Sequence, residues 1–444
     1  MRAVDTVRNM FIIPELRRKI LFTLLVVFLY RLGGHIPTPG VNTQVLKDFL
    51  AQNKDGLFGL YDMFVGGSFG RFTVFAQGIM PYITASIILQ LMGTIFPYFH
   101  KLQREGAEGR KKLTQYTRYG TVIFAAIQAT GISIFISSVE GGSAVLPQMK
   151  GFLFMFTTVV SLTTGTVIAM WLGEQITARG IGNGISLLIF IGIVADIPRI
   201  VITQARMVIA GNEGAVFNAG VGLLIVLAAT VAVVIMTQAM RRIPIQTPKK
   251  VVGTKMYQGQ NTVLPLRLNM AGVIPIIFAS SLMTFPGMII NSFGGVGTGS
   301  GSLFMEEVAR LFRPDGMLYG LIFGLLIIFF TYFYTAIVFN PVDIADNLKR
   351  QGGFIPGIRP GKKTAEFLEN VLTRITLPGS VFLALIAVLP MMLMGKIGGG
   401  FYFGGTSVLI VVGVALDTLQ QLESHLQTRN YEGFMKKGTL RGRR

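Results

Sequence analysis

The sequence predicts an all-α membrane protein whose ten transmembrane helices form two inverted five-helix halves. Composition is the first observation behind this prediction, because charged residues make up 14% of the chain and hydrophobic residues 51%. A soluble domain carries about 25% charged residues. A chain of 444 residues with this balance has more apolar surface than one core buries, so the bilayer is its natural solvent. The other two observations are long apolar stretches and the placement of the basic residues.

Eight stretches without charged residues are long enough to cross about 30 Å of hydrocarbon, which takes roughly 20 apolar residues. They are Phe72–Phe99, Tyr119–Val139, Gly151–Gly173, Gly214–Met240, Leu268–Met305, Met317–Asn340, Ile375–Gly395 and Ile397–Leu416. Two candidates are weaker: Ile20–Ile36 is interrupted by Arg31, and Gly180–Ala195 has only 16 residues. No small-residue cleavage signal follows Ile20–Ile36, so we expect an uncleaved span and not a signal peptide.

The basic clusters decide whether the two weak stretches cross. They are Arg2–Lys19, Lys101–Arg118, Arg241–Arg267, Lys349–Arg374 and the tail from Arg429. Basic loops lie on the cytosolic side of membrane proteins, so an even number of spans separates each pair of clusters. Both weak stretches must then cross, which gives ten spans and places both chain ends in the cytosol.

This topology places 30 of the 40 Lys and Arg residues inside, 9 outside, and Arg31 within a span. Arg31 lies near the outer end of its span, where we expect its side chain to snorkel to the interface. The first five helices enter from inside and the last five from outside, which is the pattern of an inverted repeat with its site between the halves. We expect a cytosolic segment 1–19, halves 20–204 and 214–423, and a cytosolic tail 424–444.

The motifs of catalysis and cofactor binding are missing from the sequence. It has no G-x-x-x-x-G-K-[ST] phosphate loop, no cysteine, and three histidines far apart. We therefore expect no metal, no cofactor and no enzymatic activity, and we interpret the glycine-rich segment Gly180–Gly184 as a tight loop. One alternative is an ion-coupled secondary transporter of a small solute, because inverted halves fit it as well. Such a transporter carries ionisable residues inside the membrane, and they are scarce here.

Two features favour a passage between helices, each with an ordinary structural alternative. Leu57–Phe72 is apolar and glycine-rich but too short to cross, so it is either an external loop or a segment sheltered by protein at membrane depth. The pairs Ile83/Ile87 and Ile189/Ile193 each lie on one helix face. They either pack against helices and lipid, or form a hydrophobic constriction that blocks ions.

Two predicted cytosolic loops are unusually long and basic. Arg241–Arg267 and Asn340–Arg374 are longer than a connection between two helices requires. Their charge suits a large, negatively charged partner, including ribosomal RNA. They thus fit either a topology signal or a docking surface.

Five long stretches of the sequence carry a recognisable pattern. They are Gly66–Leu91 (GGSFGRFTVFAQGIMPYITASIILQL), Trp171–Phe190 (WLGEQITARGIGNGISLLIF), Asn269–Ser281 (NMAGVIPIIFASS), Phe339–Gly361 (FNPVDIADNLKRQGGFIPGIRPG) and Phe401–Val412 (FYFGGTSVLIVV). These stretches resemble the SecY family, the channel subunit of the bacterial Sec preprotein translocase. The stretches are specific and stand in the family's order. The resemblance runs from about Phe11 to Lys437.

The resemblance implies a protein-conducting channel that translocates unfolded preproteins and releases transmembrane segments into lipid. The implied pore ring consists of Ile83, Ile87, Ile189, Ile193, Ile277 and Ile410. The implied plug, within 57–71, contains Leu57, Phe58, Leu60, Tyr61, Met63, Phe64, Gly66, Gly67, Phe69, Gly70 and Arg71. The implied lateral gate opens between spans two and three and spans seven and eight, with Gln90, Gln128 and Phe285 along it.

The resemblance also implies partners and a location. The implied contacts for the SecA ATPase or the ribosome are Arg241, Arg242, Lys249, Lys250, Lys255 and Arg359, in the loops 241–267 and 340–374. Further implied partners are the SecE and SecG subunits, signal peptides and nascent chains, the lipid bilayer, SecDF and YidC. The implied location is the bacterial plasma membrane. One departure from the family is Thr247-Pro248, where an aromatic residue and Ala are common before the basic pair.

Overall fold

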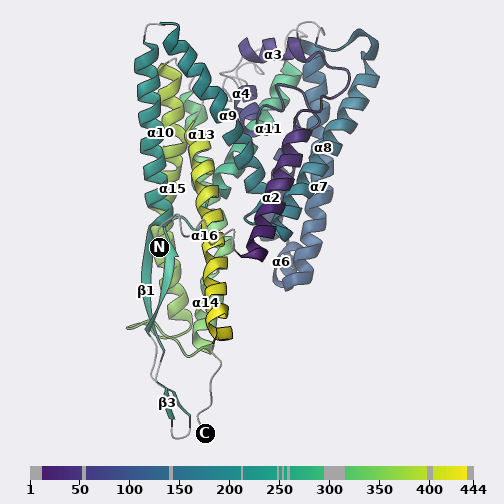
Figure 1. Cartoon of the computed structure of the whole chain (residues 1–444). Helices are drawn as coiled ribbons and strands as arrows, with labels where there is room; N and C mark the ends of the chain where they lie inside the picture. The colour runs from purple at the N-terminus through teal and green to yellow at the C-terminus, as the bar shows by residue number, and fades with distance from the viewer. Residues whose placement is uncertain are drawn as a thin grey trace. The chain divides into compact units, whose positions relative to one another are not determined.

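The computed structural model describes residues 13–52, 57–139, 144–211, 214–247, 250–252, 255–257, 261–294, 316–397 and 404–437. These residues form long helices and two small antiparallel sheets (Figure 1). The chain divides into two compact units. Unit 1 is Met1–Arg206 with Ser281–Pro314 and Val414–Arg444, and unit 2 is Met207–Ser280 with Asp315–Gly413. The helices α11 and α16 therefore each begin in unit 2 and continue in unit 1.

Unit 1 contains the N-terminal helices. They are α2 (Pro14–Gly33), α3 (Thr43–Gln52), α4 (Leu57–Phe64), α5 (Met80–Ile95), α6 (Pro97–Arg104), α7 (Gly106–Ser138), α8 (Phe152–Arg179) and most of α9 (Gly184–Ile209), with a short 3-10 turn at Pro147–Met149. Prolines open α2, α5 and α6. The first turn of a helix is where proline fits, because its missing N–H has no partner there anyway.

Unit 2 contains the remaining helices and both sheets. The helices are α10 (Ala215–Gln238), the start of α11 (Ile274–Gly294), α13 (Met317–Val338), α14 (Pro341–Arg350), α15 (Lys362–Ile397) and the start of α16 (Gly405–Lys437). Strand β1 (Met240–Gln246) pairs with β4 (Asn261–Arg267), and β2 (Lys250–Val252) with β3 (Lys255–Tyr257). The sequence analysis expected a loop over 241–267 and did not predict these strands.

Each of the ten predicted spans corresponds to one long helix or, for Phe72–Phe99, to the bent pair α5 and α6. Seven described helices meet the length and hydropathy of a membrane span on their own, and α5 with α6 makes an eighth if the bent pair counts as one. The other two are α2, whose flanking charges lower its hydropathy, and α11, whose described apolar part is short. The ten-helix fold class is confirmed, and the chain is a multi-pass membrane protein.

Two predicted boundaries were wrong for identifiable reasons. The stretch Phe72–Phe99 is not one straight helix: turns lead to α5, and α6 then leaves α5 at 105°. Phe96 is extended (φ −99°, ψ 124°) because the following proline disfavours helical geometry. Residues 184–195 of the weak stretch Gly180–Ala195 belong to a 26-residue helix, α9, and the first four residues form a turn before it. Asp196 and Arg199 ended the apolar run without ending the helix.

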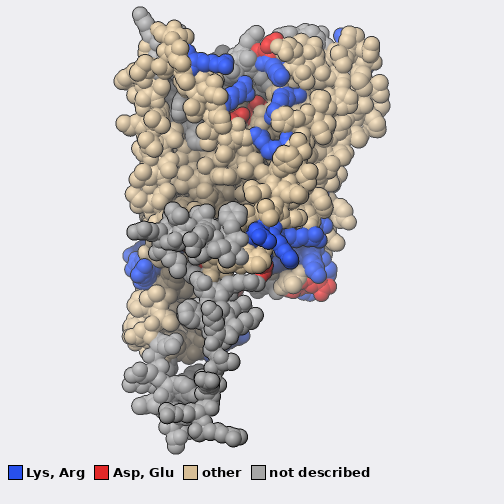
Figure 2. Space-filling view, in the orientation of Figure 1, with Lys and Arg blue, Asp and Glu red and all other residues tan. Residues whose placement is uncertain are grey.

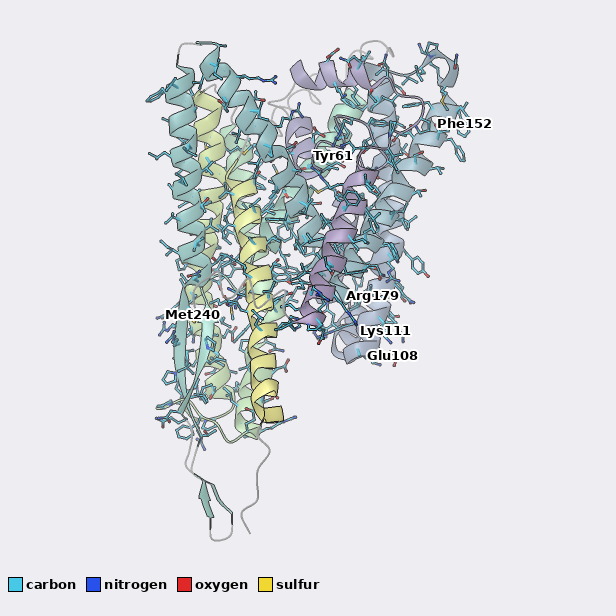
Figure 3. The ribbon with its side chains drawn as sticks, in the orientation of Figure 1. Tyr61, Glu108, Lys111, Phe152, Arg179 and Met240 are labelled. Atoms are coloured by element: carbon cyan, nitrogen blue, oxygen red, sulfur yellow. The ribbon has the colours of Figure 1, made fainter. Side chains whose placement is uncertain are left out.

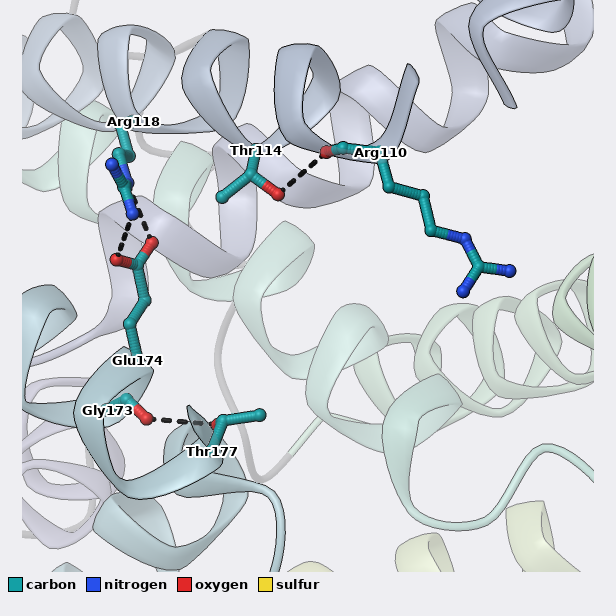
Figure 4. A network of polar contacts seen from close by, with 6 residues as sticks. All are labelled: Arg110, Thr114, Arg118, Gly173, Glu174 and Thr177. Carbon is teal, nitrogen blue, oxygen red and sulfur yellow. Dashed lines mark hydrogen bonds and ion pairs between the residues drawn. The ribbon is translucent and has the colours of Figure 1, made fainter. Parts of the chain in front are cut away.

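Helices α7 and α8 are joined by an ion pair between the N-terminal half of α7 and the C-terminal end of α8. Arg118 donates from Nε and Nη2 to the two carboxylate oxygens of Glu174, at 3.0 and 2.7 Å (Figure 4). Close by, Thr177 Oγ1 donates to the carbonyl of Gly173 in its own helix and accepts from the N–H of Gly184. A forked pair of this kind fixes direction as well as distance, so α7 and α8 are aligned where the chain turns towards α9.

The turn at Gly180–Asn183 is the tight loop that the glycines predicted, with Gly182 at φ +86°. The N–H of Ile181 donates to Thr23 Oγ1 of α2 at 3.1 Å, and the N–H of Gly182 donates to Gln421 Oε1 of α16 at 3.0 Å. Leu16, Ile181 and Leu422 form a small apolar cluster beside them. The loop therefore ties the first and last described helices together within unit 1.

The two basic segments of unit 2 share one hydrophobic core. Its members are Ile243, Leu266, Phe339, Ile355, Leu368, Val371, Leu372 and Ile375. Gln246 and Phe354 exchange two backbone hydrogen bonds of 2.9 Å, which joins β1 to the 351–361 segment. Along β1, Ile243 and Ile245 are buried while Arg241 and Arg242 are exposed. The hairpin and the second loop thus form one ordered surface.

Candidate functional site

A non-spanning segment lies packed inside unit 1 between α2 and α5. It comprises α4 and the turns from 65 to 79. Tyr61, Phe69 and Phe72 are at most 1% exposed, and the rings of Tyr61 and Phe69 meet edge to face at 5.3 Å (Figure 3). The packing of Tyr61, Phe69 and Phe72 agrees with a sheltered segment, and the position of Leu57–Phe72 in the membrane stays a prediction. The side chains of Leu57, Phe58 and Leu60 lie outside the described residues.

A glycine allows this segment to touch α9. Gly66 has φ +69°, and a Cβ there would lie 2.9 Å from the Cα of Gly192 in α9. A Cβ on Gly192 would in turn lie 2.7 Å from the carbonyl oxygen of Phe64. Two facing glycines let the backbones approach to a distance that side chains would prevent. Any larger residue at either position would push the segment away from α9.

Arginine side chains hold the same turn through backbone carbonyls. Arg71 donates from Nε to the carbonyl of Gly67 at 2.9 Å and from Nη2 to the carbonyl of Gly66 at 3.2 Å. Arg31 donates from Nη1 to the Gly66 carbonyl at 3.3 Å. Arg31 is half-buried and its guanidinium reaches a carbonyl of this segment, and its position relative to the membrane interface stays a prediction.

Asp62 closes the segment on itself. Its Oδ1 accepts a hydrogen bond of 2.7 Å from the backbone N–H of Gly70. Burial raises the pKa of the Asp62 carboxyl to about 6, and the negative charge of Asp196 acts in the same direction. The Gly70 hydrogen bond and the charges of Arg199 and Arg71 oppose that shift. The carboxyl therefore titrates near neutral pH inside a packed turn.

Four of the six isoleucines named above lie in unit 1. Ile83 and Ile87 are on α5, and Ile189 and Ile193 are on α9; all are at most 4% exposed. Ile83 and Ile189 line one cavity of about 10 Å³ together with Tyr30, Phe64, Val65, Ile79 and Met80. That space barely admits one water molecule. The buried segment and two of the isoleucines thus close the same small space.

The other two isoleucines are on elements of unit 2. Ile277 is on α11 and Ile410 on α16, and they are 6% and 0% exposed. Their burial agrees with the expected role but does not assign it. Completion of a ring from all six residues stays a prediction.

Helices α5 and α11 meet through two buried hydroxyls. Thr84 Oγ1 and Ser281 Oγ lie 3.0 Å apart, and both residues belong to unit 1. The sequence analysis missed this pair, although Ser281 ends one of its quoted stretches. Gln90, on the same helix as Thr84, donates to Ser86 Oγ at 3.2 Å. Gln128 is buried on α7, and the side chain of Phe285 lies outside the described residues.

Of the basic residues expected to dock partners, Arg241, Arg242 and Arg359 lie on the shared surface of unit 2. Arg359 is exposed, and its backbone carbonyl accepts from Thr364 Oγ1 at 3.0 Å. Lys250 and Lys255 lie on the β2–β3 hairpin, and Lys249 falls outside the described residues. On unit 1, Figure 2 shows basic side chains gathered around α6 and the start of α7, and a separate group near α4.

Comparison with known proteins assigns the family. Residues 73–419 match the family model described as SecY. The chain belongs to the SecY family. It is 44% identical over 431 residues to the protein translocase subunit SecY of Escherichia coli K12, with 96% of each chain covered. The residues quoted in the sequence analysis therefore identified the family correctly.

Solved structures of the SecY/Sec61 channel share the fold. One is described by its plug domain, which stabilises the closed state of the translocation channel; it has a TM-score of 0.64 and 20% identity, and 92% of each chain is covered. Sec61 in a canine ribosome-channel complex has a TM-score of 0.64 and 18% identity, with the same coverage. Among the described residues of this chain, no group of His, Cys, Asp or Glu could hold a metal ion.

Proposed function

We propose that this chain is the protein-conducting channel of a Sec translocon. It moves unfolded preproteins across the membrane and releases transmembrane segments sideways into lipid. The observation that carries the proposal is the small cavity of about 10 Å³ that Phe64, Ile83 and Ile189 line together. A non-spanning segment packed against branched apolar side chains is what a plugged channel requires. Residues 57–71 are the plug in this proposal.

The six isoleucines form the pore ring. A translocating chain is extended and varied in sequence, so a channel that bound it tightly would stall. Branched apolar side chains offer no hydrogen bonds and yield around any sequence. When the channel is empty, a narrow apolar ring dewets and resists ions. In this proposal the ring consists of Ile83, Ile87, Ile189, Ile193, Ile277 and Ile410.

In this proposal the lateral gate opens between spans two and three (α5 and α7) and spans seven and eight (α11 and α13). The Thr84–Ser281 contact is its closed latch, and Gln90, Gln128 and Phe285 are further gate residues. A signal helix of about 20 apolar residues favours lipid over water. Its contacts at the seam shift the population towards the open state.

Partners supply the energy and complete the complex. The chain has no catalytic role of its own in this proposal, so SecA or a translating ribosome drives the substrate. These partners dock on Arg241, Arg242, Lys249, Lys250, Lys255 and Arg359. SecE and SecG associate in the bacterial plasma membrane, with SecDF and YidC as accessory partners. Both chain ends are cytosolic, and the halves 20–204 and 214–423 are inverted repeats.

Cross-linking of a stalled secretory chain tests the proposal. The chain has no cysteine, so Ile87→Cys and Ile277→Cys introduce single reactive sites. Ile123→Cys is the control, because Ile123 is 59% exposed on α7. We expect adducts at positions 87 and 277 and only background at 123. Equal yields at all three positions would exclude a central pore and favour a small-solute transporter.

A further inference from the structure

Gln77 is a fully buried polar residue that joins three parts of unit 1. It is 0% exposed and lies between the plug and α5. Its side chain donates from Nε2 to the carbonyl of Ala125 on α7 at 3.1 Å, and its Oε1 accepts from Thr166 Oγ1 on α8 at 3.1 Å. Its own backbone carbonyl accepts from the hydroxyl of Tyr61 at 3.2 Å. One residue thus connects the plug helix with two neighbouring helices.

The surroundings of Gln77 are packed closely enough to transmit a displacement. Gly165 of α8 lies directly against the backbone carbonyl of Val74, where a Cβ would collide. Met80 and Pro81 begin α5 three residues after Gln77. Interiors of this density carry a shift from one element to the next and do not absorb it. Gln77 lies in the short connection between the plug segment and α5, which is a helix of the proposed gate.

Packing alone does not account for a glutamine here. An amide is costly to bury unless its hydrogen bonds are made, and an apolar residue of similar size would fill the space without that requirement. The amide uses both ends of its side chain, one on α7 and one on α8. What glutamine adds over leucine is therefore a directional link between those helices and the plug.

We propose that Gln77 is a positioning residue that keeps the plug seated until the gate-side helix α7 moves. This inference rests on the proposed channel function. A signal helix that enters between α5 and α11 separates Thr84 from Ser281 and displaces α5 and α7. A hydrogen bond of 3.1 Å is lost within an additional ångström. The hydrogen bond from the Gln77 amide to the Ala125 carbonyl then breaks. The backbone carbonyl of Gln77, which accepts from the Tyr61 hydroxyl, is then no longer held in place.

A single cysteine in the plug reports whether it is seated. Ser68 is 2% exposed in the buried segment. Ser68→Cys in the complete translocon, in proteoliposomes, is labelled from outside by a membrane-impermeant maleimide, and the rate measures how often the plug leaves its place. The test variants are Gln77→Leu, Thr166→Val and Tyr61→Phe. Thr158→Val is the matched control, because Thr158 is also 0% exposed on α8 but its hydroxyl has no partner in the described structure.

We expect each test variant to raise the resting labelling rate roughly three- to fifteen-fold, as the loss of one buried interhelical hydrogen bond predicts. Thr158→Val should leave the rate unchanged. Gln77→Leu combined with Thr166→Val should add little to Gln77→Leu alone, since Gln77→Leu already removes the hydrogen bond from Thr166. Thermal unfolding is measured in parallel, because a residue that only packs would lower the melting temperature without changing the labelling rate.

Two results separate this inference from the proposed function. If Ser68→Cys is labelled at one rate in resting and substrate-engaged channels, residues 57–71 are not a plug and the channel assignment itself fails. If engagement raises the rate but Gln77→Leu and Thr166→Val match Thr158→Val, the channel assignment stands and the role of Gln77 is refuted. Thr166→Val is nearly isosteric, so the test holds even if Gln77→Leu does not fold.

Discussion

Arg71 Nη1 lies 2.8 Å from Nε2 of His35. The other ring nitrogen, Nδ1, lies 2.8 Å from the carbonyl oxygen of Arg31 and must donate to it, because a carbonyl only accepts. Nε2 is then the acceptor for the Arg71 guanidinium. The imidazole of His35, two residues after the end of α2, and the guanidinium that holds Gly66 and Gly67 therefore form one chain of contacts.

Removal of this guanidinium should loosen the plug. Arg71→Gln loses the hydrogen bonds to the carbonyls of Gly66 and Gly67, and hydrogen bonds to a charged group contribute about 1.5–3 kcal/mol each. We expect faster resting labelling of Ser68→Cys, by about tenfold or more. Lys150→Gln, an exposed change on unit 1 away from the plug, should have no effect. Equal rates in both variants would contradict a holding role for Arg71.

The hydroxyl pair between α5 and α11 should set how readily the gate opens. Ser281→Ala and Thr84→Val each break it, which in membranes is worth about 0.6 and at most about 1.7 kcal/mol. We expect export of a precursor with a weakened signal sequence to rise by roughly three- to fifteen-fold. The control is Thr121→Val, since Thr121 is buried on α7 and donates to its own helix at Thr117. An unchanged export rate in both gate variants would show that this contact does not latch the gate.

A polar side chain in the proposed ring should hydrate the closed constriction. Ile83→Asn and Ile410→Asn are expected to produce ion conductance in resting channels, because an amide holds water where a branched apolar group dewets. Ile83→Val keeps the apolar surface and should remain tight. The measurement is single-channel recording in planar bilayers. Silent channels in both asparagine variants would remove these residues from the ring.

The exposed arginine of the second basic segment should contact the motor. Arg359→Glu reverses a charge outside the shared core, so we expect it to slow SecA-driven export several-fold while the chain still inserts into the membrane. Arg350→Glu, also exposed in the same segment, is the matched control for charge alone. The readout is the rate of precursor protection from protease in vesicles. Similar slowing in both variants would point to net charge and not to a specific contact.

The carboxyl of Asp62 should make plug stability depend on external pH. Its pKa is raised from 3.8 to about 6, so the folded segment binds the proton more tightly than an unfolded chain does. The stability is therefore greatest below about pH 4 and falls as the pH rises through 6. We expect lower resting conductance at external pH 5 than at pH 7.5, and no difference in Asp62→Asn.

That comparison is best made in a His35→Gln background, which removes the imidazole beside Arg71. Within residues 57–71 Asp62 is the one carboxylic acid, and Asp196 of α9 is a neighbouring carboxyl outside them. A resting conductance that still changes with pH in Asp62→Asn would assign the effect to another group.

The helices were predictable from the sequence because lipid imposes one simple rule on them. A span must be apolar for about 20 residues, and basic loops stay inside. The number of spans between two basic clusters is therefore even, and this rule identified even the two weak spans. Their ends were not predictable by that rule. Proline at 97 bends the chain at Phe96, and the charges of Asp196 and Arg199 are tolerated inside α9.

The candidate site was predictable only where the sequence resembled the SecY family or where residues recurred at helical spacing. The isoleucines recur at helical spacing, and the plug stretch is too short to cross. No such pattern distinguishes Thr84, Ser281 and Gln77. Each is a single polar residue in an apolar stretch, and its hydrogen-bond partner is known only from the folded structure. The β1–β4 hairpin was hidden for a similar reason, since its pairing joins residues about 20 apart in the sequence.

The loop at Gly180–Asn183 has a consequence for how the chain is made. Gly182 donates to Gln421, and Ile181 packs with Leu422, both on the last described helix. A ribosome synthesises residues 421 and 422 more than 200 residues after this loop. Unit 1 therefore waits through the synthesis of all of unit 2 before its final helix arrives. Until then the N–H of Gly182 lacks Gln421 and the side chain of Ile181 lacks Leu422, so the contacts of this loop are completed only when α16 has been made.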